Sequence, residues 1–259
     1  MFIRKLFKVG DKAKWLALEL LIVFIGVYMA FLFQQYGENK KLQKEKDKVL
    51  TSLKLELEEF RTGFPRFSVF QKEKTDEWDS LFAIEEVGDY YNWRYYEPQY
   101  NIRIIEYALN QEGTDVINFE IYDELSKLHA RIKQLEFAER KMTAFGENYR
   151  LIPASLPKNS TERTIMNAEN RFTFYKFIEA AKSRTRSLRD VARESAGLLI
   201  MVNQELGPEK TRQADMLLLR KYVEADVEID FVKEVFLEFF PQYTTEEFDE
   251  EVRKIQQAL

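Results

Sequence analysis

Histidine has the widest chemical repertoire of any side chain near neutral pH, and this chain contains one, His129. A ferritin-like di-metal site needs a Glu-x-x-His motif on each of two helices, but Ser126 stands where that glutamate would be. The zinc-protease pattern His-Glu-x-x-His and the glycine-rich phosphate loops are also absent from the sequence. We therefore interpret His129 as an ordinary residue at the boundary of a helix's apolar face.

Carboxylates are the other chemically capable groups, and three of them alternate at Asp226, Glu228 and Asp230. A calcium loop that began this way would need glycine at its sixth position and glutamate at its twelfth, where the chain has Phe231 and Leu237. We interpret these acids as a solvated face or a helix start. A carboxylate hydrolase would need a tight group of buried acids in a pocket, and no spacing in the sequence identifies one.

The chain has no cysteine, which removes disulfides, thiol nucleophiles and thiolate metal sites. Asn159-Ser160-Thr161 matches a glycosylation acceptor, but such a short pattern arises readily by chance. We therefore predict a protein that is not an enzyme, with no catalytic residue, no cofactor and no metal.

One segment, residues 15–33, is far more apolar than the rest: nineteen residues with a single charge, Glu19. At about 1.5 Å per residue, a helix of this length reaches roughly 28 Å, close to the hydrocarbon thickness of a bilayer. Trp15 and Tyr36 flank it, and amphipathic aromatic rings prefer the headgroup region. We predict a transmembrane helix over 15–36, preceded by a basic tail over 1–14.

A cleaved signal peptide is the main alternative for this segment. The apolar run is longer than the usual core of about 7–15 residues, and the stretch from Ala30 to Gln34 lacks a small-x-small cleavage pattern. A buried core helix of a soluble protein is a second alternative. It is disfavoured because the run is apolar all round rather than striped.

Charge predicts the orientation of the span and limits the partners. Lys and Arg are equal in number on the two flanks, but the first fourteen residues carry a net charge of +4. Because cytoplasmic flanks are rich in Lys and Arg, we predict a cytoplasmic N-terminus with the bulk of the chain translocated. The whole chain carries −5, so the part beyond the tail carries −9, which disfavours nucleic acid and anionic lipid as partners of that part.

Four residues of the span, spaced seven, four and four apart, lie on one helical face: Glu19, Gly26, Ala30 and Gln34. The small pair Gly26 and Ala30 would let a second helix approach closely. A carboxylate within an apolar run is costly unless it is protonated, paired or near the interface. We interpret this face as a packing seam for self-association or for a membrane partner. Alternatively, Glu19 lies at headgroup depth and makes no specific contact.

The remainder reads as all-α, because no strand-type alternation appears and the chain has only nine Gly and six Pro. We predict a helical stalk over 37–62, continuous with the span and ended by Gly63 and Pro65. An elongated antiparallel helical bundle domain should follow over 63–259. The stalk has an apolar stripe at three-four spacing, formed by Leu50, Leu53, Leu57 and Phe60.

Two long helices should form the centre of the bundle. The first should begin after Asn118, a good N-cap, and the second at Ser160 or Thr161. The first seam contains Ile121, Leu125, Leu128, Ile132 and Leu135 and resumes at Met142, Phe145 and Tyr149. The second contains Phe174, Ile178, Ala181, Thr185, Leu188, Ala192, Ser195, Leu199, Val202 and Leu206. A repeat of about 3.5 residues sustained over this length indicates antiparallel bundle packing or a coiled coil. The two helices should therefore lie side by side.

Shorter helices complete the predicted bundle. They are expected at about 66–87, 101–111, 216–223 and 231–240. A last amphipathic helix should begin at a capping box formed by Thr244 and Glu247 and use Phe248, Val252 and Ile255.

Aromatic residues are unusually dense between the first two of these helices: Tyr90, Tyr91, Trp93, Tyr95, Tyr96 and Tyr100. Exposed aromatics at this density can bind sugars, peptides or a protein partner. The alternative, which we favour, is that they cap the end of the bundle with their hydroxyls toward water.

Some of these residues also carry a family resemblance. They are Leu18-Glu19-Leu20-Leu21-Ile22-Val23, Gly26-Val27, Ala30-Phe31 and Gln34, followed by a Lys/Glu-rich helix with Leu50, Leu53 and Leu57. Over about 15–60 the chain resembles an uncharacterised single-pass membrane family common in Bacteroidota. A thinner similarity covers Tyr107, Leu109, Gly113, Ile117-Asn118, Leu125 and Leu128. The chain departs from the family at Gln34-Gln35-Tyr36-Gly37, where an Asn-Asn-Trp-Asn-like stretch is usual. The resemblance implies a Gram-negative inner-membrane protein and no particular activity.

Together these patterns predict a membrane-anchored, non-enzymatic helical bundle of the cell envelope that acts as a scaffold, binds a partner or self-assembles. The expected partners are the lipid bilayer and either further copies of the chain or another membrane protein, but not nucleic acid. The alternative hypothesis is a periplasmic ligand-sensing bundle. It would have to signal through a membrane partner, because the fourteen residues before the span are too few for an output domain.

Overall fold

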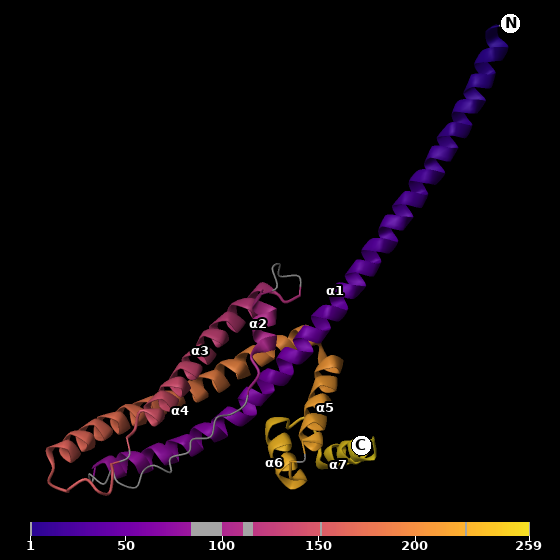
Figure 1. Cartoon of the computed structure of the whole chain (residues 1–259). Coiled ribbons are helices and arrows are strands. Elements are labelled where there is room, and N and C mark those ends of the chain that lie inside the picture. The colour runs from indigo at the N-terminus through magenta and orange to yellow at the C-terminus, as the bar shows by residue number, and fades with distance from the viewer. Residues whose placement is uncertain (1, 84–99, 111–115, 151, 226, 259) are drawn as a thin grey trace. The chain divides into compact units, whose positions relative to one another are not determined.

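The computed structural model describes residues 2–83, 100–110, 116–150, 152–225 and 227–258. In these residues the chain is helical and has no strand, so the all-α prediction is confirmed (Figure 1). The helices are α1 (Phe2–Ala83), α2 (Arg103–Asn110), α3 (Phe119–Glu147), α4 (Thr161–Leu206), α5 (Pro208–Glu224), α6 (Ile229–Phe239) and α7 (Thr245–Ala258).

The contacts divide the chain into two compact units, Met1–Lys48 and Val49–Leu259. The first unit consists of the N-terminal part of α1. Its most apolar window of eighteen residues has a mean hydropathy of 1.7 and no buried side chain. Among the described residues, α1 is the one helix that is long and apolar enough to cross a membrane.

The predicted helix break at Gly63 and Pro65 is wrong, because α1 runs through both residues to Ala83. A proline inside a helix costs about 3 kcal/mol, since it lacks the amide hydrogen and its ring crowds the preceding turn. Burial on both sides of Pro65 outweighs this cost. Phe64 and Trp78 are buried, and each large apolar side chain contributes about 1.5–3 kcal/mol when it leaves water. The helices expected as a stalk and at 66–87 are therefore one element.

The second unit is built around α3 and α4, which pair in antiparallel orientation as predicted. Residues near the start of α3 contact the end of α4, and residues near its end contact the middle of α4. The contacts that show this are Asn118 with Glu205 at 3.4 Å, Arg131 with Glu194 at 3.0 Å, and Glu139 with Arg184 at 3.0 Å.

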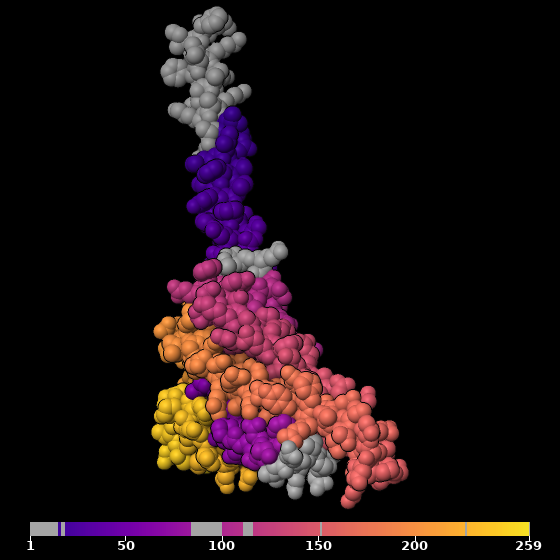
Figure 2. Space-filling view, turned by 90° about the vertical axis from the view of Figure 1, so that its left-hand side faces the viewer, coloured from indigo at the N-terminus to yellow at the C-terminus, as the bar shows by residue number. Residues whose placement is uncertain are grey.

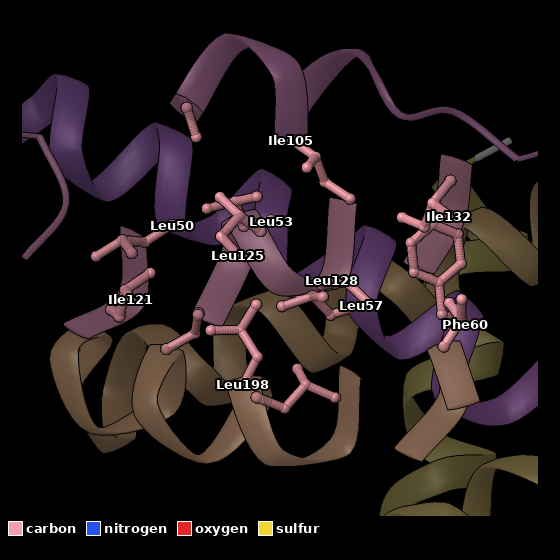
Figure 3. Packing of buried hydrophobic residues seen from close by; sticks show 14 of the residues in the cluster. Leu50, Leu53, Leu57, Phe60, Ile105, Ile121, Leu125, Leu128, Ile132 and Leu198 are labelled. Carbon is pink, nitrogen blue, oxygen red and sulfur yellow. The ribbon is translucent and has the colours of Figure 1, made fainter. Parts of the chain in front are cut away.

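The C-terminal half of α1 also lies antiparallel to α4. Ser68 contacts Arg189, Gln71 contacts Arg184, and Asp79 contacts Lys182. In Figure 2 this part of α1 is seen in purple at the surface, between the yellow C-terminal helices and orange α4. Figure 3 shows the shared core of the three helices, where Leu53 and Leu57 of α1 meet Leu125, Leu128 and Leu198.

The residues of the two predicted seams are buried, with the exception of Phe145 and Tyr149 at the end of the first seam, which are half-buried. The predicted caps are also present. The Asn118 side chain accepts a hydrogen bond from the Ile121 amide, and Ser160, rather than Thr161, accepts one from the Arg163 amide. Thr244 and Glu247 exchange hydrogen bonds of 3.0 and 3.2 Å as a capping box.

The helices α5, α6 and α7 enclose a second core of their own. It is formed by Leu218, Leu219, Val223, Val232, Phe236, Phe240, Tyr243, Phe248, Val252 and Ile255, with Leu55 of α1 packed against it. Helix α5 begins earlier than the pattern at 216–223 indicated. Gly207 adopts a φ of 76° and Pro208 occupies the first turn of α5, where its missing amide hydrogen costs nothing. One helix therefore ends and the next begins within two residues.

Candidate functional site

The four residues of the predicted seam, Glu19, Gly26, Ala30 and Gln34, are exposed in the first unit. A Cβ atom built on Gly26 would have no neighbour within 4 Å. Gln34 donates a hydrogen bond of 2.9 Å to Glu38, one turn further on. Since α1 is continuous through all four positions, their spacing places them on one face of the helix. Within this unit that face is open to a second helix.

The aromatic patch is described only at Tyr100, because Tyr90, Tyr91, Trp93, Tyr95 and Tyr96 lie outside the described residues. The ring of Tyr100 packs edge-on against Phe60 and Phe64, with centroids 6.1 and 5.6 Å apart. Its hydroxyl donates a hydrogen bond of 3.0 Å to Glu139. Burial, followed by the nearby Glu139 carboxylate, raises the pKa of Tyr100. Tyr100 thus packs in the bundle's own core, and the prediction that its hydroxyl faces water is wrong, because the hydroxyl bonds to Glu139 instead.

A buried polar network joins α1, α3 and α4, and Arg184 lies at its centre with 1% of its surface exposed. Its guanidinium donates to Glu139 at 3.0 Å and to Gln71 at 2.5 Å. Glu139 also accepts the hydroxyl of Tyr100. A buried charge is tolerated only when it is paired and hydrogen-bonded. This network therefore fixes which residues of the three helices face one another.

A second buried network joins α1 to α5 and to the segment before α7. Lys54 lies 2.7 Å from Asp215 and 3.0 Å from Glu58, and the exposed fraction of each of the three residues is 3% or less. Tyr243 donates a hydrogen bond of 2.8 Å to Asp215. Arg61 also donates a hydrogen bond of 2.6 Å to Glu58, so two cations balance the two acids and attach the C-terminal helices to α1 at a defined register.

Nothing in the sequence pattern marks these charges as core residues. Around Lys54 the pattern points the other way, because Lys54, Glu58 and Arg61 recur at four-three spacing and form a charged ladder along α1. Such ladders usually lie in solvent, so the pattern alone favours an exposed face. Arg184 directly precedes the seam residue Thr185, and no local pattern marks it as buried.

Glu56 is a third buried acid on α1, with 7% of its surface exposed. Its carboxylate accepts a hydrogen bond of 2.9 Å from the backbone amide of Asn101, just before α2. Burial raises the pKa of Glu56 to about 7, although the Asn101 hydrogen bond acts in the opposite direction. Glu56 therefore changes its ionisation near neutral pH while it holds the chain that leads into α2.

His129 lies at the edge of the apolar face of α3, as interpreted. Its Nε2 atom is 3.6 Å from the Glu106 carboxylate, and 27% of its side chain is exposed. Glu228 and Asp230 lie at the start of α6, which agrees with their interpretation as a helix start; Asp226 is outside the described residues. Within the described part of the chain, no three His, Asp or Glu side chains gather closely enough to hold a metal ion.

An apolar groove of about 300 Å³ lies in the second unit between α1 and the α5–α6 region. Its walls come from Gly63 and Phe67 on one side and from Val227, Phe231, Val232 and Val235 on the other, with Arg66 at the rim. No sequence pattern indicated this groove, because its two walls lie more than 150 positions apart in the chain. It forms only when α6 packs beside α1.

Comparisons with known proteins give no indication of the function. No protein-family model matches the sequence, and no curated protein or solved structure matches it either.

Proposed function

We propose that this chain is a membrane-anchored, non-enzymatic helical-bundle protein of the cell envelope, which binds a membrane partner or self-assembles through its span. The observation that carries the proposal is the first unit of α1. Its apolar window has no buried side chain, and exposing this much apolar surface to water is unfavourable. A bilayer would remove that cost, and a span of about 20 residues would suffice.

The face formed by Glu19, Gly26, Ala30 and Gln34 supports association inside the membrane. Small residues let two backbones approach, and polar side chains at the ends of the face can bond across the helices. A carboxylate at this depth is stabilised by a partner. In the second unit, by contrast, Arg184 and Lys54 are paired with acids of the same chain, which favours a structural rather than a catalytic role for them.

The test of the seam is the double substitution Gly26→Leu with Ala30→Leu in the full chain. The matched control is Phe24→Leu with Phe31→Leu, which introduces the same two leucines on roughly the opposite side of the helix. We expect the first variant to shift the oligomer toward monomer in mild detergent, measured by light scattering after size exclusion, while the control keeps its wild-type mass. Equal masses for wild type and both variants would contradict the seam.

The orientation can be tested with cysteine labelling, because the chain has no native cysteine. Ser155 is exposed between α3 and α4. If the bulk of the chain is periplasmic, Ser155→Cys should react with a membrane-impermeant maleimide in cells whose outer membrane has been permeabilised, whereas Lys8→Cys should react only after lysis. The reverse pattern would contradict a cytoplasmic N-terminus.

A further inference from the structure

The apolar groove beside Gly63 has the chemistry of a ligand site. Its volume of about 300 Å³ lies at the lower end of the range for small-molecule pockets. The uncharged polar side chains in its wall already form hydrogen bonds within the protein. Thr62 donates a hydrogen bond of 2.7 Å to the Glu58 carbonyl, and Tyr222 is hydrogen-bonded to Thr62. The groove therefore offers apolar surface along its length.

Arg66 is the one charged residue among those that line the groove, and we place it at the rim because 37% of its side chain is exposed. Its guanidinium is held 4.9 Å from the centre of the Phe231 ring. It also pairs with Glu238 at 3.3 Å, but the two side chains are 37% and 59% exposed. An ion pair this exposed contributes little to stability. An incoming carboxylate could therefore take the place of Glu238 and form a bidentate contact with Arg66.

Gly63 lies in the wall of the groove. Glycine inside a helix destabilises it relative to alanine, and space is not the reason for it here. A Cβ atom on Gly63 would meet only the Phe67 ring, at an ordinary contact distance of 3.7 Å. The helix could thus accept alanine at this position, whereas a larger side chain would extend into the groove.

We propose that this groove binds a free medium-chain fatty acid, with the alkyl chain along Phe67, Phe231 and Val235 and the carboxylate on Arg66. The apolar walls match the alkyl chain, and the rim cation matches the single negative charge. This inference goes beyond the proposed function and does not depend on self-association of the span. Because the groove lies wholly within the second unit, it also does not depend on how the chain is anchored.

The test uses the full chain in nanodiscs of zwitterionic phospholipid and a decanoic acid that carries a diazirine at its far end. After illumination, we expect the label on peptides that contain 62–67 or 227–235, and we expect unlabelled decanoate, but not decanol, to compete for it. Gly63→Leu should sharply reduce this labelling, because its side chain would occupy space that the alkyl chain needs. Gly197→Leu is the matched control, because Gly197 is exposed on α4 with no atom within 4 Å of its Cβ position. It should label like the wild type.

A second pair of variants tests the charge and keeps the proposal falsifiable if Gly63→Leu does not fold, as judged by circular dichroism. Arg66→Gln should weaken competition by decanoate about tenfold, and Arg66→Lys should retain more of it. Equal labelling of folded Gly63→Leu and Gly197→Leu, or equal competition by decanol and decanoate, would overturn the proposal. So would labelling confined to peptides outside the groove.

Discussion

The two units of this chain distribute apolar and charged residues in opposite ways. In the first, apolar side chains such as Phe24 and Ile25 are exposed, and its apolar window has none buried. In the second, the side chains of Leu53 and Leu128 are buried, and so are the charged groups of Lys54 and Arg184. The first pattern is unfavourable in water, whereas the second is what an aqueous domain produces when its buried charges are paired. The comparison therefore makes the first unit the candidate membrane span of the chain.

The largest expected effect comes from breaking the buried charge network of the second unit. Arg184→Met leaves the Glu139 carboxylate in a core without its guanidinium partner. Losing one partner of a buried pair costs about 3–5 kcal/mol, so the free energy of unfolding should fall by that amount. Urea titration of the full chain in mild detergent, followed by tryptophan fluorescence, measures it.

The control for that substitution is Arg193→Met. Arg193 pairs with Asp190 at 2.7 Å, but 72% of its side chain is exposed, so the expected change is about 1 kcal/mol or less. If both substitutions destabilised the protein equally, the buried network would contribute no more to stability than an exposed ion pair. The paired buried charges would then no longer distinguish the second unit from the first.

The next largest effect is a pH dependence of stability that arises from Glu56. Its pKa is raised to about 7 in the folded protein from an ordinary value of 4.5. Between pH 4.5 and 7 the folded state therefore keeps a proton on Glu56 that the unfolded state has released. The free energy of unfolding should consequently fall as the pH rises through this range. Since one pKa unit corresponds to about 1.4 kcal/mol, the decrease due to Glu56 should be about 2–3 kcal/mol. Glu56→Gln, which can still accept the Asn101 amide, should remove that part of the decrease. Identical pH profiles for the two proteins would refute this assignment.

A smaller effect, an increase rather than a decrease in stability, is expected when Pro65 is substituted. This proline lies inside α1 and cannot donate a hydrogen bond to the carbonyl four residues earlier. Pro65→Ala should restore that bond and raise the free energy of unfolding by about 1–3 kcal/mol. The same urea titration measures the gain. A loss of stability would mean that the local geometry of α1 has adapted to the proline ring.

Local patterns predicted much of the second unit. The seams from Ile121 and from Phe174, the Asn118 cap and the Thr244–Glu247 capping box all follow from residues a few positions apart, and all are present. These features depend on short-range geometry, in which side-chain spacing decides which face is buried.

Features that depend on tertiary packing could not be predicted in this way. Pro65 is a strong local signal for a helix end, but burial of Phe64 and Trp78 keeps α1 continuous. Arg184 is buried because Glu139 and Gln71 approach it from other helices. The groove at Gly63 needs α6 beside α1. The packing role of the face at Glu19 and Gly26 remains a prediction, because testing it requires the second helix that would pack there.

The membrane anchor is the premise of the proposed function, and alkaline carbonate extraction of native membranes tests it most directly. The full chain should stay in the membrane pellet after carbonate treatment, and a variant with two charges in the apolar window, such as Ile22→Lys with Val23→Lys, should move toward the supernatant. Recovery of the unmodified chain wholly in the aqueous fraction would contradict the anchor and the proposed function that depends on it.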